Sequence, residues 1–424
     1  MSAAGVGVAA TRREAANTEA VARMAAAEPV LVDVRRGGDV VPGLSPTTIL
    51  TSGAPLPWPA YTGGQRRAVL SAAVYEGLAA SEADADAALH SGHLQLGSTH
   101  DHGCVGSVAG IYTASMPVFV VEDAASGRRG FCNLYEGESR KRLNYGVYDP
   151  EVAAGLDFLR DELGPVLGEA VRRLGGMPLT PLIARALRMG DELHSRNTAA
   201  TTLFLKQLTP ALLAMAGDGE LAAARSAFDF LAASDYSFLR LSMAAAKVVA
   251  DSARGVPGSS VVTAMTISCR EFAIRVGGTG DTWFRGSLPD VDCRLFDGFT
   301  PEDIEWIGGE SHITETTGLG GFAQAAAFSL QEYQGGTPAA MVEMNERMYA
   351  ITVAEHTHYR IPYLGFRGSP LGIDVFKVLE TGIQPVIDGG LAGRDGGQIG
   401  AGILRAPLDC FAAAGREWTA RYGE

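Results

Sequence analysis

The N-terminal part of the chain carries both extended and helical hydrophobic patterns. Largely apolar runs at 29–34 and 116–123 predict buried strands, and a polar turn after the second run makes 131–137 its expected hairpin partner. Apolar positions three to four residues apart predict helices over 13–27, 63–79 and 81–92, with Ser81 as the N-cap of the last.

The pattern changes at Pro150 and again near residue 255. Between these points apolar positions keep helical spacing almost throughout, which predicts a group of several helices. Beyond residue 255 extended patterns return, and consecutive strands are expected over 261–267, 271–278 and 281–288. The remaining expected elements are a Gly/Ala-rich helix over 318–336, a strand over 348–366, a helix over 372–382, and a strand with a glycine loop over 384–407.

This order of elements predicts an α+β fold in which mixed α/β domains flank a helical-bundle insertion. The expected boundaries are an N-terminal α/β domain over 1–148, a helical-bundle domain over 149–254 and a C-terminal α+β domain over 255–424. A chain of 424 residues has the usual length for two or three such domains.

Composition and charge narrow the classes of function. The net charge is −13 and no basic stripe with interleaved aromatic residues occurs, so nucleic acid is not an expected partner. The five cysteines are scattered without a CxxC pair, which is typical of a reducing compartment. The charged N-terminal segment does not resemble a secretion signal, and no run of about 18 consecutive apolar residues occurs. We therefore expect a soluble, cytoplasmic protein without a membrane partner.

The stretch "STHDHGCVGSVAG" (98–110) holds the first candidate side chains. In an extended segment His100 and His102 point to the same side, where their ring nitrogens could bind together. A metal site needs three or four converging ligands, and no further ligands stand near these two, so no metal is predicted. Two interpretations stay open, a polar loop that caps strand ends and a loop that contacts substrate.

The densest polar window is "RMGDELHSRN" (188–197). On a helix, Arg188, Glu192 and Ser195 would share one face, and Asp191 and His194 would lie beside Ser195. A solvated helix surface carries such charges, but the flanking segments are almost wholly apolar. A surface helix and a cleft-facing site are therefore both compatible with this window.

Two glycine-rich segments, 317–322 and 393–402, have neither the spacing of a P-loop nor the context of a dinucleotide-binding turn. No cofactor is therefore predicted. The first segment could begin a helix whose N–H groups face an anion, and a tight turn is the alternative. Without a serine-hydrolase elbow, kinase or zincin motif, the residues alone indicate a multi-domain cytosolic enzyme with a polar cleft.

Several ordered blocks between about Ala16 and about Phe411 carry a resemblance to a known family. They include "STHDHGCVGSVAGIYTASMPVFVVED", "RMGDELHSRNTAATTLFLKQLTPAL", "VGGTGDTWF", "TETTGLGGFAQAAA" and "GGQIGAGILRAPLDCF". With these blocks the chain resembles the AllG/YlbE-like subunits of oxamate carbamoyltransferase, a family of allantoin catabolism. The resemblance implies interconversion of oxalurate plus phosphate with oxamate plus carbamoyl phosphate. It also implies small carboxylate or amide substrates and an FdrA-like partner subunit.

The matched blocks also imply the residues of the site. Carbamoyl transfer passes through a tetrahedral oxyanion, for which the glycine loops could supply N–H donors, and anionic substrates favour arginine forks. The implied catalytic residues are His100, His102, Asp191, Glu192, His194 and Glu271. The implied substrate-binding residues are Arg188, Arg196, Asn197, Asp281, Glu315, Gly318, Gly320, Gly397 and Gln398.

The chain departs from the usual family pattern at Ser107-Val108, at 267–269 and at 391–394. These departures predict a divergent member whose carbamoyl donor or acceptor has changed. Two further functions stay open. One is hydrolysis or ring opening of a cyclic amide or ureide, with water as the acceptor, and the other is a non-catalytic subunit of a carbamoyltransferase. The apolar helical region also favours assembly into a homo-oligomer.

Overall fold

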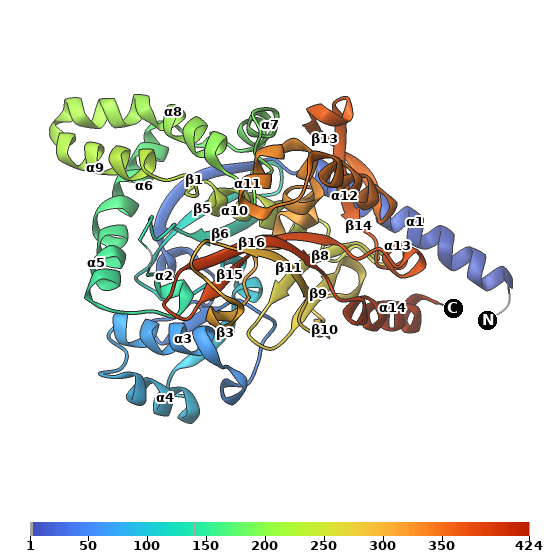
Figure 1. Cartoon of the computed structure of the whole chain (residues 1–424), viewed down its shortest axis with the longest axis horizontal. Coiled ribbons are helices and arrows are strands. Elements are labelled where there is room, and N and C mark those ends of the chain that lie inside the picture. The colour runs from blue at the N-terminus through green and yellow to red at the C-terminus, as the bar shows by residue number, and fades with distance from the viewer. Residues whose placement is uncertain (1–2, 140, 424) are drawn as a thin grey trace.

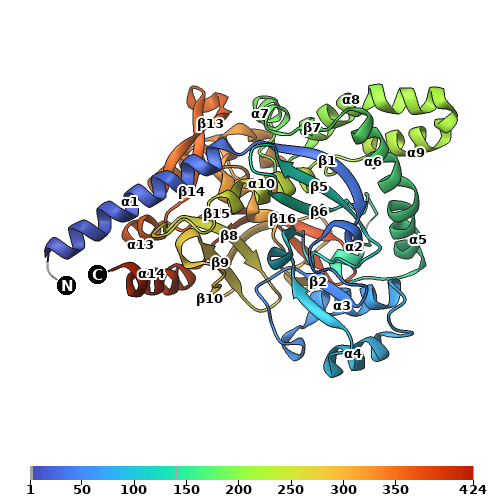
Figure 2. The same ribbon diagram turned by 180° about the vertical axis from the view of Figure 1, so that it is seen from behind.

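A buried helix lies at the centre of the molecule. The computed structural model describes residues 3–139 and 141–423, and small sheets pack around α10 (Leu239–Ser252), as Figures 1 and 2 show. Every residue of α10 after Leu239 is buried, which fits a helix whose side chains are small or apolar on almost all sides. Close approach needs small neighbours: a Cβ on Gly130 would lie 2.8 Å from the carbonyl oxygen of Ala244. The predicted α+β class is confirmed.

The largest sheet packs against α10 and has five strands. The predicted hairpin is confirmed, because β5 and β6 pair antiparallel, and the strand expected at 29–34 is β1. One short strand, β7, comes from the helical region and pairs with β1. The strand order is β4 (Cys104–Val105), β6 (Arg129–Asn133), β5 (Pro117–Asp123), β1 (Pro29–Arg36) and β7 (Met177–Pro178).

Helices follow one another from Pro150, as the apolar spacing predicts. Their inner faces join β1, β5 and α10 in one hydrophobic cluster. The helices of this region before α10 are α5 (Pro150–Phe158), α6 (Gly164–Arg173), α7 (Thr180–Arg188), α8 (Thr198–Met215) and α9 (Leu221–Ala232).

Within the described residues, the stretch Thr198–Ala232 is the one helical segment long and apolar enough to cross a membrane by length and composition. It is not a continuous rod. Gly219 has a φ of +101°, outside the helical region, and α8 and α9 fold back beside each other (Figure 1). Half of its most apolar window is buried inside the protein. We therefore interpret the segment as a helical hairpin packed on the core.

The N-terminal part confirms the three predicted helices. The hydroxyl of Ser81 accepts a hydrogen bond from the N–H of Asp84 at 3.2 Å, so Ser81 is the N-cap. The elements here are α1 (Ala3–Ala26), α2 (Gly37–Val40), β2 (Thr48–Thr51), α3 (Gly63–Tyr75), α4 (Glu82–Ser91) and β3 (Gln95–Ser98), of which β2 and β3 form a parallel pair.

The C-terminal part holds three further sheets. The predicted consecutive strands form an antiparallel sheet of β8 (Val262–Ile267), β9 (Phe272–Val276) and β10 (Phe284–Gly286). A second sheet has the order β11 (Asp290–Leu295), β16 (Gln398–Arg405), β15 (Val386–Gly393) and β12 (Ile304–Trp306). The third pairs β13 (Thr352–Ile361) with β14 (Arg367–Ile373). The helices are α11 (Gln331–Gln334), α12 (Pro338–Ala350), α13 (Val375–Thr381) and α14 (Leu408–Tyr422).

The predicted Gly/Ala-rich helix over 318–336 is wrong. This segment forms a series of single 3₁₀ turns before the one short turn of α11. Gly318 and Gly320 have φ values of +86° and +56°, which a helix does not allow. The strand expected over 348–366 begins only at Thr352, because α12 occupies the residues before it.

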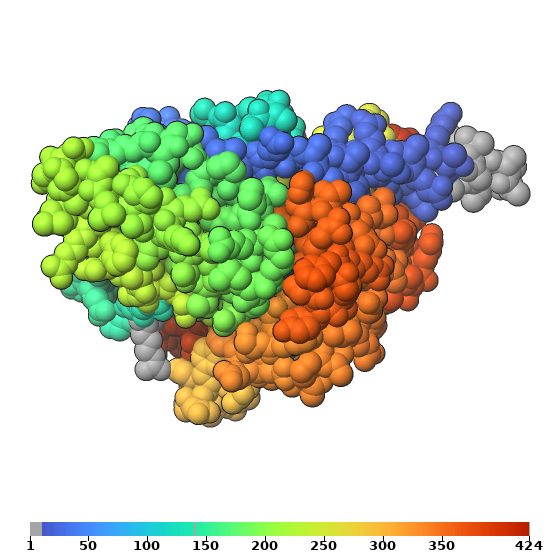
Figure 3. Space-filling model, turned by 90° about the horizontal axis from the view of Figure 1, so that it is seen from above, coloured from blue at the N-terminus to red at the C-terminus, as the bar shows by residue number. Residues whose placement is uncertain are grey.

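One hydrophobic cluster contains residues of all three predicted domains. It extends from Leu31 through the helical region to Ile361. Figure 3 shows the helical region and the C-terminal region side by side, with α1 along one edge. The predicted boundaries at 148 and 254 are therefore crossed by the same cluster, and the three-domain division stays a prediction.

Candidate functional site

A polar cavity of about 230 Å³ lies beside the N-terminal end of α10. Its walls come from segments far apart in the sequence: the loops after β4 and β6, the turn before α8, the start of α10, residues 308–311 and the β15–β16 hairpin. Four tyrosines line it together with Ser107, Arg142, His194, Ser195, Arg240, Ser311 and Gln398. The cavity is therefore rich in hydrogen-bonding groups and carries two cationic side chains and one carboxylate, that of Glu138.

The polar window 188–197 is a tight turn and not a helix, so its expected helical faces do not form. It joins the end of α7 to the start of α8, and Leu193 has a φ of +71°, which is uncommon for a residue other than glycine. The Glu192 carboxylate accepts hydrogen bonds from the N–H groups of His194 (3.2 Å), Ser195 and Arg196 (2.9 Å). This arrangement holds His194 at the cavity wall.

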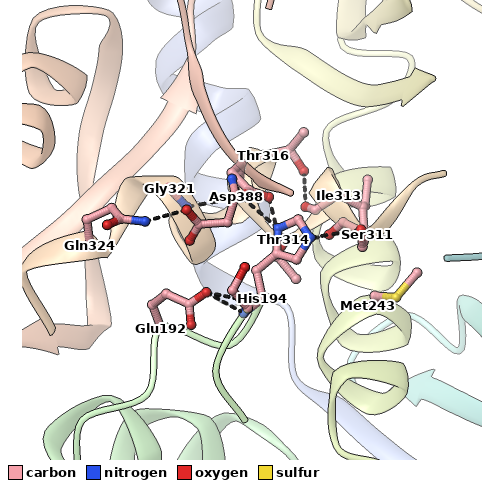
Figure 4. A network of polar contacts seen from close by, with 12 residues as sticks. Glu192, His194, Met243, Ser311, Ile313, Thr314, Thr316, Gly321, Gln324 and Asp388 are labelled. Carbon is pink, nitrogen blue, oxygen red and sulfur yellow. Dashed lines mark hydrogen bonds and ion pairs between the residues drawn. The ribbon is translucent and has the colours of Figure 1, made fainter. Parts of the chain in front are cut away.

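His194 stands at the centre of a chain of hydrogen bonds (Figure 4). Its Nδ1 lies 2.8 Å from Glu315 Oε1, and its Nε2 lies 2.8 Å from Ser311 Oγ. Glu315 is buried and also accepts hydrogen bonds from the N–H groups of Gly321 and Asp388, each at 3.0 Å. An ionised carboxylate only accepts, so Nδ1 of His194 carries the proton and Nε2 accepts from the Ser311 hydroxyl.

The charges of this pair support each other. Burial opposes the charged form of both groups, but Glu315 raises the pKa of His194 above its ordinary value. Burial likewise raises the pKa of Glu315, but the charge and hydrogen bond of His194 and the N–H donors outweigh it, and the net shift is downward. Glu315 is therefore ionised at neutral pH, and His194 is a stronger base than an isolated histidine.

A second pair of carboxyl groups lies behind His194. Burial raises the pKa of Glu192 well above its ordinary value, and Asp388 raises it further. Burial and the Glu315 charge raise the pKa of Asp388 to about 7, against the hydrogen bonds from Glu192, Gln334 and Gln324. A hydrogen bond joins the two buried carboxyl groups, and such a pair favours one shared proton. We place this proton between Glu192 and Asp388.

The buried carboxyl groups of Asp388 and Glu310 make the free energy of unfolding depend on pH. Asp388 and Glu310 both have a pKa near 7 in the folded chain, while an unfolded carboxyl titrates near 4. The folded state therefore holds extra protons, and the stability from these groups is complete below about pH 4 and is lost as pH rises through about 7. We expect the melting temperature to fall between about pH 5 and pH 8, and to fall less in Asp388→Asn. Differential scanning fluorimetry across this range checks it, and an equal fall in both proteins would contradict it.

Two arginines face the cavity and form no close ion pair within the described residues, although the charges of Glu136 and Glu138 act on Arg142. Arg240 is buried and donates to Asn133 Oδ1 at 3.2 Å, while the Arg142 guanidinium stacks over the rings of Tyr135 (4.9 Å) and Tyr145 (5.5 Å). Within the described residues, the Nε of each arginine is buried and has no hydrogen-bond partner. Two guanidinium groups against one lining carboxylate leave positive charge in excess, which favours an anionic ligand in the cavity.

The first predicted histidines do not reach this cavity. His100 is fully buried, its Nε2 lies 3.7 Å from Glu310 Oε1, and burial lowers its pKa well below the ordinary value. His102 lies with Nδ1 2.6 Å from the carbonyl oxygen of Pro42. Neither histidine lines the cavity, and the fully buried His100 is not accessible to a ligand there, so their catalytic role stays a prediction from the sequence.

Glu271 and Asp281 also lie away from the cavity lining. Glu271 forms an ion pair with Arg285, and the largely exposed Asp281 forms one with Arg254. Glu271 lies in the turn between β8 and β9 and Asp281 in the turn between β9 and β10, so neither takes part in the cavity wall.

The other polar residues of the 188–197 turn support it from behind. Asp191 accepts the N–H of Ala200 at 2.8 Å, and burial raises its pKa to about 6. Arg196 Nε lies 3.4 Å from the same carboxylate, and the Asn197 amide donates to the carbonyl of His194 at 2.9 Å. Arg188 is exposed at the end of α7. Asp191, Arg196 and Asn197 therefore stabilise the turn that carries His194, and none of these residues, nor Arg188, lines the cavity.

The glycine segment 317–322 was expected to offer N–H donors to an oxyanion, but it serves internal hydrogen bonds and close packing. The N–H groups of Gly320 and Gly321 are used, since they donate to the Glu192 carbonyl (2.8 Å) and to Glu315. A Cβ on Gly318 would lie 2.6 Å from Ser369 Oγ, so Gly318 serves close packing. Gly397 and Gln398 do line the cavity, but residues from 398 onward belong to β16, whose backbone pairs with β11 and β15.

Sequence reasoning missed Arg142, Arg240 and Ser311. Arg142 stands in the Tyr- and Arg-rich loop 135–145 directly after the predicted hairpin, which is a usable signal. Arg240 interrupts an otherwise apolar helix, which is another. Ser311 stands four residues before Glu315, but nothing local to the chain reveals that both contact His194.

Among the described residues, no group of three or more His, Cys, Asp or Glu side chains is placed to hold a metal ion, and the absence of a metal or cofactor stays a prediction.

Comparisons with known proteins agree with the resemblance. A family model for oxamate carbamoyltransferase subunit AllG matches residues 94–311. The oxamate carbamoyltransferase subunit AllG of Escherichia coli K12 is 37% identical over 404 residues, which are 94% of this chain and 96% of that protein. The chain belongs to the AllG family.

Other members of similar sequence have no stated activity. The uncharacterized protein YahG of the same E. coli strain is 39% identical over 411 residues, 96% of this chain and 86% of YahG. A crystal structure of a conserved protein of unknown function from Enterococcus faecalis V583 has a TM-score of 0.93 at 39% identity, covering 97% of this chain and 98% of that one. The identities to YahG and AllG are similar, which is consistent with a divergent AllG-like member.

Proposed function

We propose that the cavity binds a small ureide carboxylate of the oxalurate type and transfers its carbamoyl group to phosphate. The observation that carries this proposal is the pair of cavity-facing guanidinium groups, Arg142 and Arg240, whose Nε atoms have no hydrogen-bond partner among the described residues and which outnumber the one lining carboxylate, Glu138. Arginine forks match carboxylate and phosphate oxygens, and the cavity volume of about 230 Å³ suits a small molecule.

The roles follow from the contacts around the cavity. His194 Nε2 faces a hydroxyl at the wall and takes or returns the proton that moves when the carbamoyl C–N bond is made or broken. The arginines stabilise the oxyanion of the tetrahedral intermediate, a task that the N–H groups of Gly320 and Gly321 are not free to perform. Ser107 and Val108, where the chain departs from the family pattern, line the cavity and are the proposed determinants of a changed substrate.

The alternative functions give different outcomes in one assay. A hydrolase or ring-opening enzyme would consume its ureide without phosphate, whereas a transferase requires it. A non-catalytic subunit would show no turnover alone or with its partner. A catalytic subunit is supported because one chain holds all the proposed groups, namely His194, Glu315, Ser311 and both arginines. We further propose that this subunit acts in the cytoplasm as a homo-oligomer with an FdrA-like partner.

Replacing Arg240 with glutamine should raise the KM for the ureide carboxylate by about 10- to 100-fold, because a hydrogen bond to a charged group contributes about 1.5–3 kcal/mol. Phosphorolysis of oxalurate, measured with and without the partner subunit, provides the rates. The matched control is Arg225→Gln, whose side chain is 79% exposed on α9. An unchanged KM in Arg240→Gln, or equal turnover without phosphate, would refute the proposal.

A further inference from the structure

One hydroxyl group in the cavity has the surroundings of an activated nucleophile. Ser311 Oγ lies 2.8 Å from His194 Nε2, and His194 Nδ1 lies 2.8 Å from Glu315 Oε1. Ser311 lines the cavity, and His194 is only 5% exposed. A serine, a base and a carboxylate that orients the base form the arrangement by which unrelated enzymes activate a hydroxyl group for covalent catalysis.

The protonation states suit this role. Glu315 accepts hydrogen bonds from two backbone N–H groups and from the hydroxyl of Thr314 at 2.8 Å, so its lone pairs are satisfied without a proton of its own. The Nδ1–H of His194 therefore points at Glu315. Its Nε2 lone pair is left for the Ser311 proton.

The backbone around the relay supports it on both sides. The Glu192 carboxylate holds the His194 turn, and the N–H of Gly320 binds the Glu192 carbonyl at 2.8 Å. Ser311 follows Glu310, whose buried carboxylate accepts the N–H groups of Gly53 (3.2 Å) and Gly106 (3.0 Å). The nucleophile and the base are thus each carried on a segment pinned by a buried carboxyl group.

We propose that Ser311 is the covalent catalyst of this chain and accepts the carbamoyl group as an ester. This inference deepens the proposed function and rests on it for the identity of the donor. Ser311 Oγ forms a bond to the carbamoyl carbon, and its proton passes to His194 Nε2. The C–N bond of the donor breaks, and His194 returns the proton to the departing amide nitrogen.

The second half-reaction restores the enzyme. An oxygen of hydrogen phosphate forms a bond to the ester carbon, and His194 takes the phosphate proton. The bond between that carbon and Ser311 Oγ breaks, and His194 gives the proton to the serine oxygen. The products are carbamoyl phosphate and free Ser311. Transfer is therefore a double displacement, and the donor fragment leaves before phosphate reacts.

A carbamate ester with a good leaving group tests the nucleophile without relying on the natural donor. The probe is 4-nitrophenyl N,N-dimethylcarbamate, which has no N–H and so cannot eliminate to an isocyanate that would label amines. The full-length chain should release a burst of 4-nitrophenolate, and peptide mass spectrometry should find one dimethylcarbamoyl group on Ser311. His194→Asn should slow this labelling by about 10²-fold or more.

Matched variants separate relay chemistry from general reactivity. Ser311→Ala should abolish the adduct. Ser91→Ala should keep it, because Ser91 is exposed at the end of α4 and its Oγ donates to the carbonyl of Ala88 at 3.1 Å. Absence of the adduct in a wild-type chain whose circular dichroism shows it to be folded would overturn the proposal, as would equal labelling in His194→Asn.

Isotope exchange distinguishes failure of this inference from failure of the proposed function. If a carbamoyl-enzyme forms, labelled oxamate should enter oxalurate in the absence of phosphate, and Ser311→Ala should lose this exchange. Turnover with phosphate but no exchange would overturn the covalent step and leave the transferase function standing. Labelling of Ser311 by the carbamate without any turnover of oxalurate would support the nucleophile and refute the proposed substrate.

Discussion

His194→Asn should lower kcat for carbamoyl transfer by about 10²- to 10⁴-fold, the range that a positioned acid–base group contributes. Asparagine occupies similar space and can keep a hydrogen bond toward Glu315, but it cannot take the proton of Ser311. The KM for substrate should change little, because Arg142 and Arg240 remain in place. Steady-state phosphorolysis of oxalurate measures both parameters.

A double-variant comparison tells chemistry from folding. Residues that act as one unit have non-additive effects, so the Ser311→Ala/His194→Asn protein should lose no more activity than either single variant. His93→Asn is the control, since His93 is an exposed histidine that contacts Ser91 at the end of α4. Full activity in His194→Asn, or losses that multiply in the double variant, would argue against a shared relay.

Gly320→Ala should lower both the activity and the melting temperature, because the new Cβ would displace the Glu315–His194 pair. Gly320 has a φ of +56°, and a Cβ there would collide with Glu315 Oε1 and lie 3.0 Å from His194 Cβ. Glu315 must shift, and a displacement of about 1 Å at a catalytic group can cost about 10²-fold in rate. We expect kcat to fall by about that factor, with a lower melting temperature as well.

The control for this prediction is Gly382→Ala at the end of α13. Gly382 has a φ of +66°, and nothing lies within 4 Å of the position that a Cβ would take there. This variant carries only the backbone cost of a left-handed residue, about 1 kcal/mol, and should keep full activity. Equal loss of stability and equal activity in the two variants would show that Gly320 matters for its backbone alone.

Local patterns were sufficient where neighbours in the sequence are also neighbours in space. The β5–β6 hairpin, the Ser81 cap and the three antiparallel strands after residue 261 all depend on short-range contacts, and each was predicted. The segment 318–336 failed for the opposite reason. Its alanines favour a helix, but its glycines do not, and its backbone N–H groups bind the buried side chains of Glu315 and Asn345, which lie outside the segment.

By itself, the sequence determined the family, the mixed α+β class, and His194, Glu315 and Gln398 as candidate site residues. Only the tertiary structure decided which polar residues meet. Ser311 and Glu315 lie 117 and 121 residues from His194 along the chain, and hydrogen-bond contact at 2.8 Å depends on how the helical region packs against the C-terminal part. The surroundings also distinguish two histidines that the sequence treats alike. Burial lowers the pKa of His100 and keeps it neutral in the core, while Glu315 raises the pKa of His194 at the cavity. Such pairings over long sequence distances are set by packing, and spacing along the chain does not encode them.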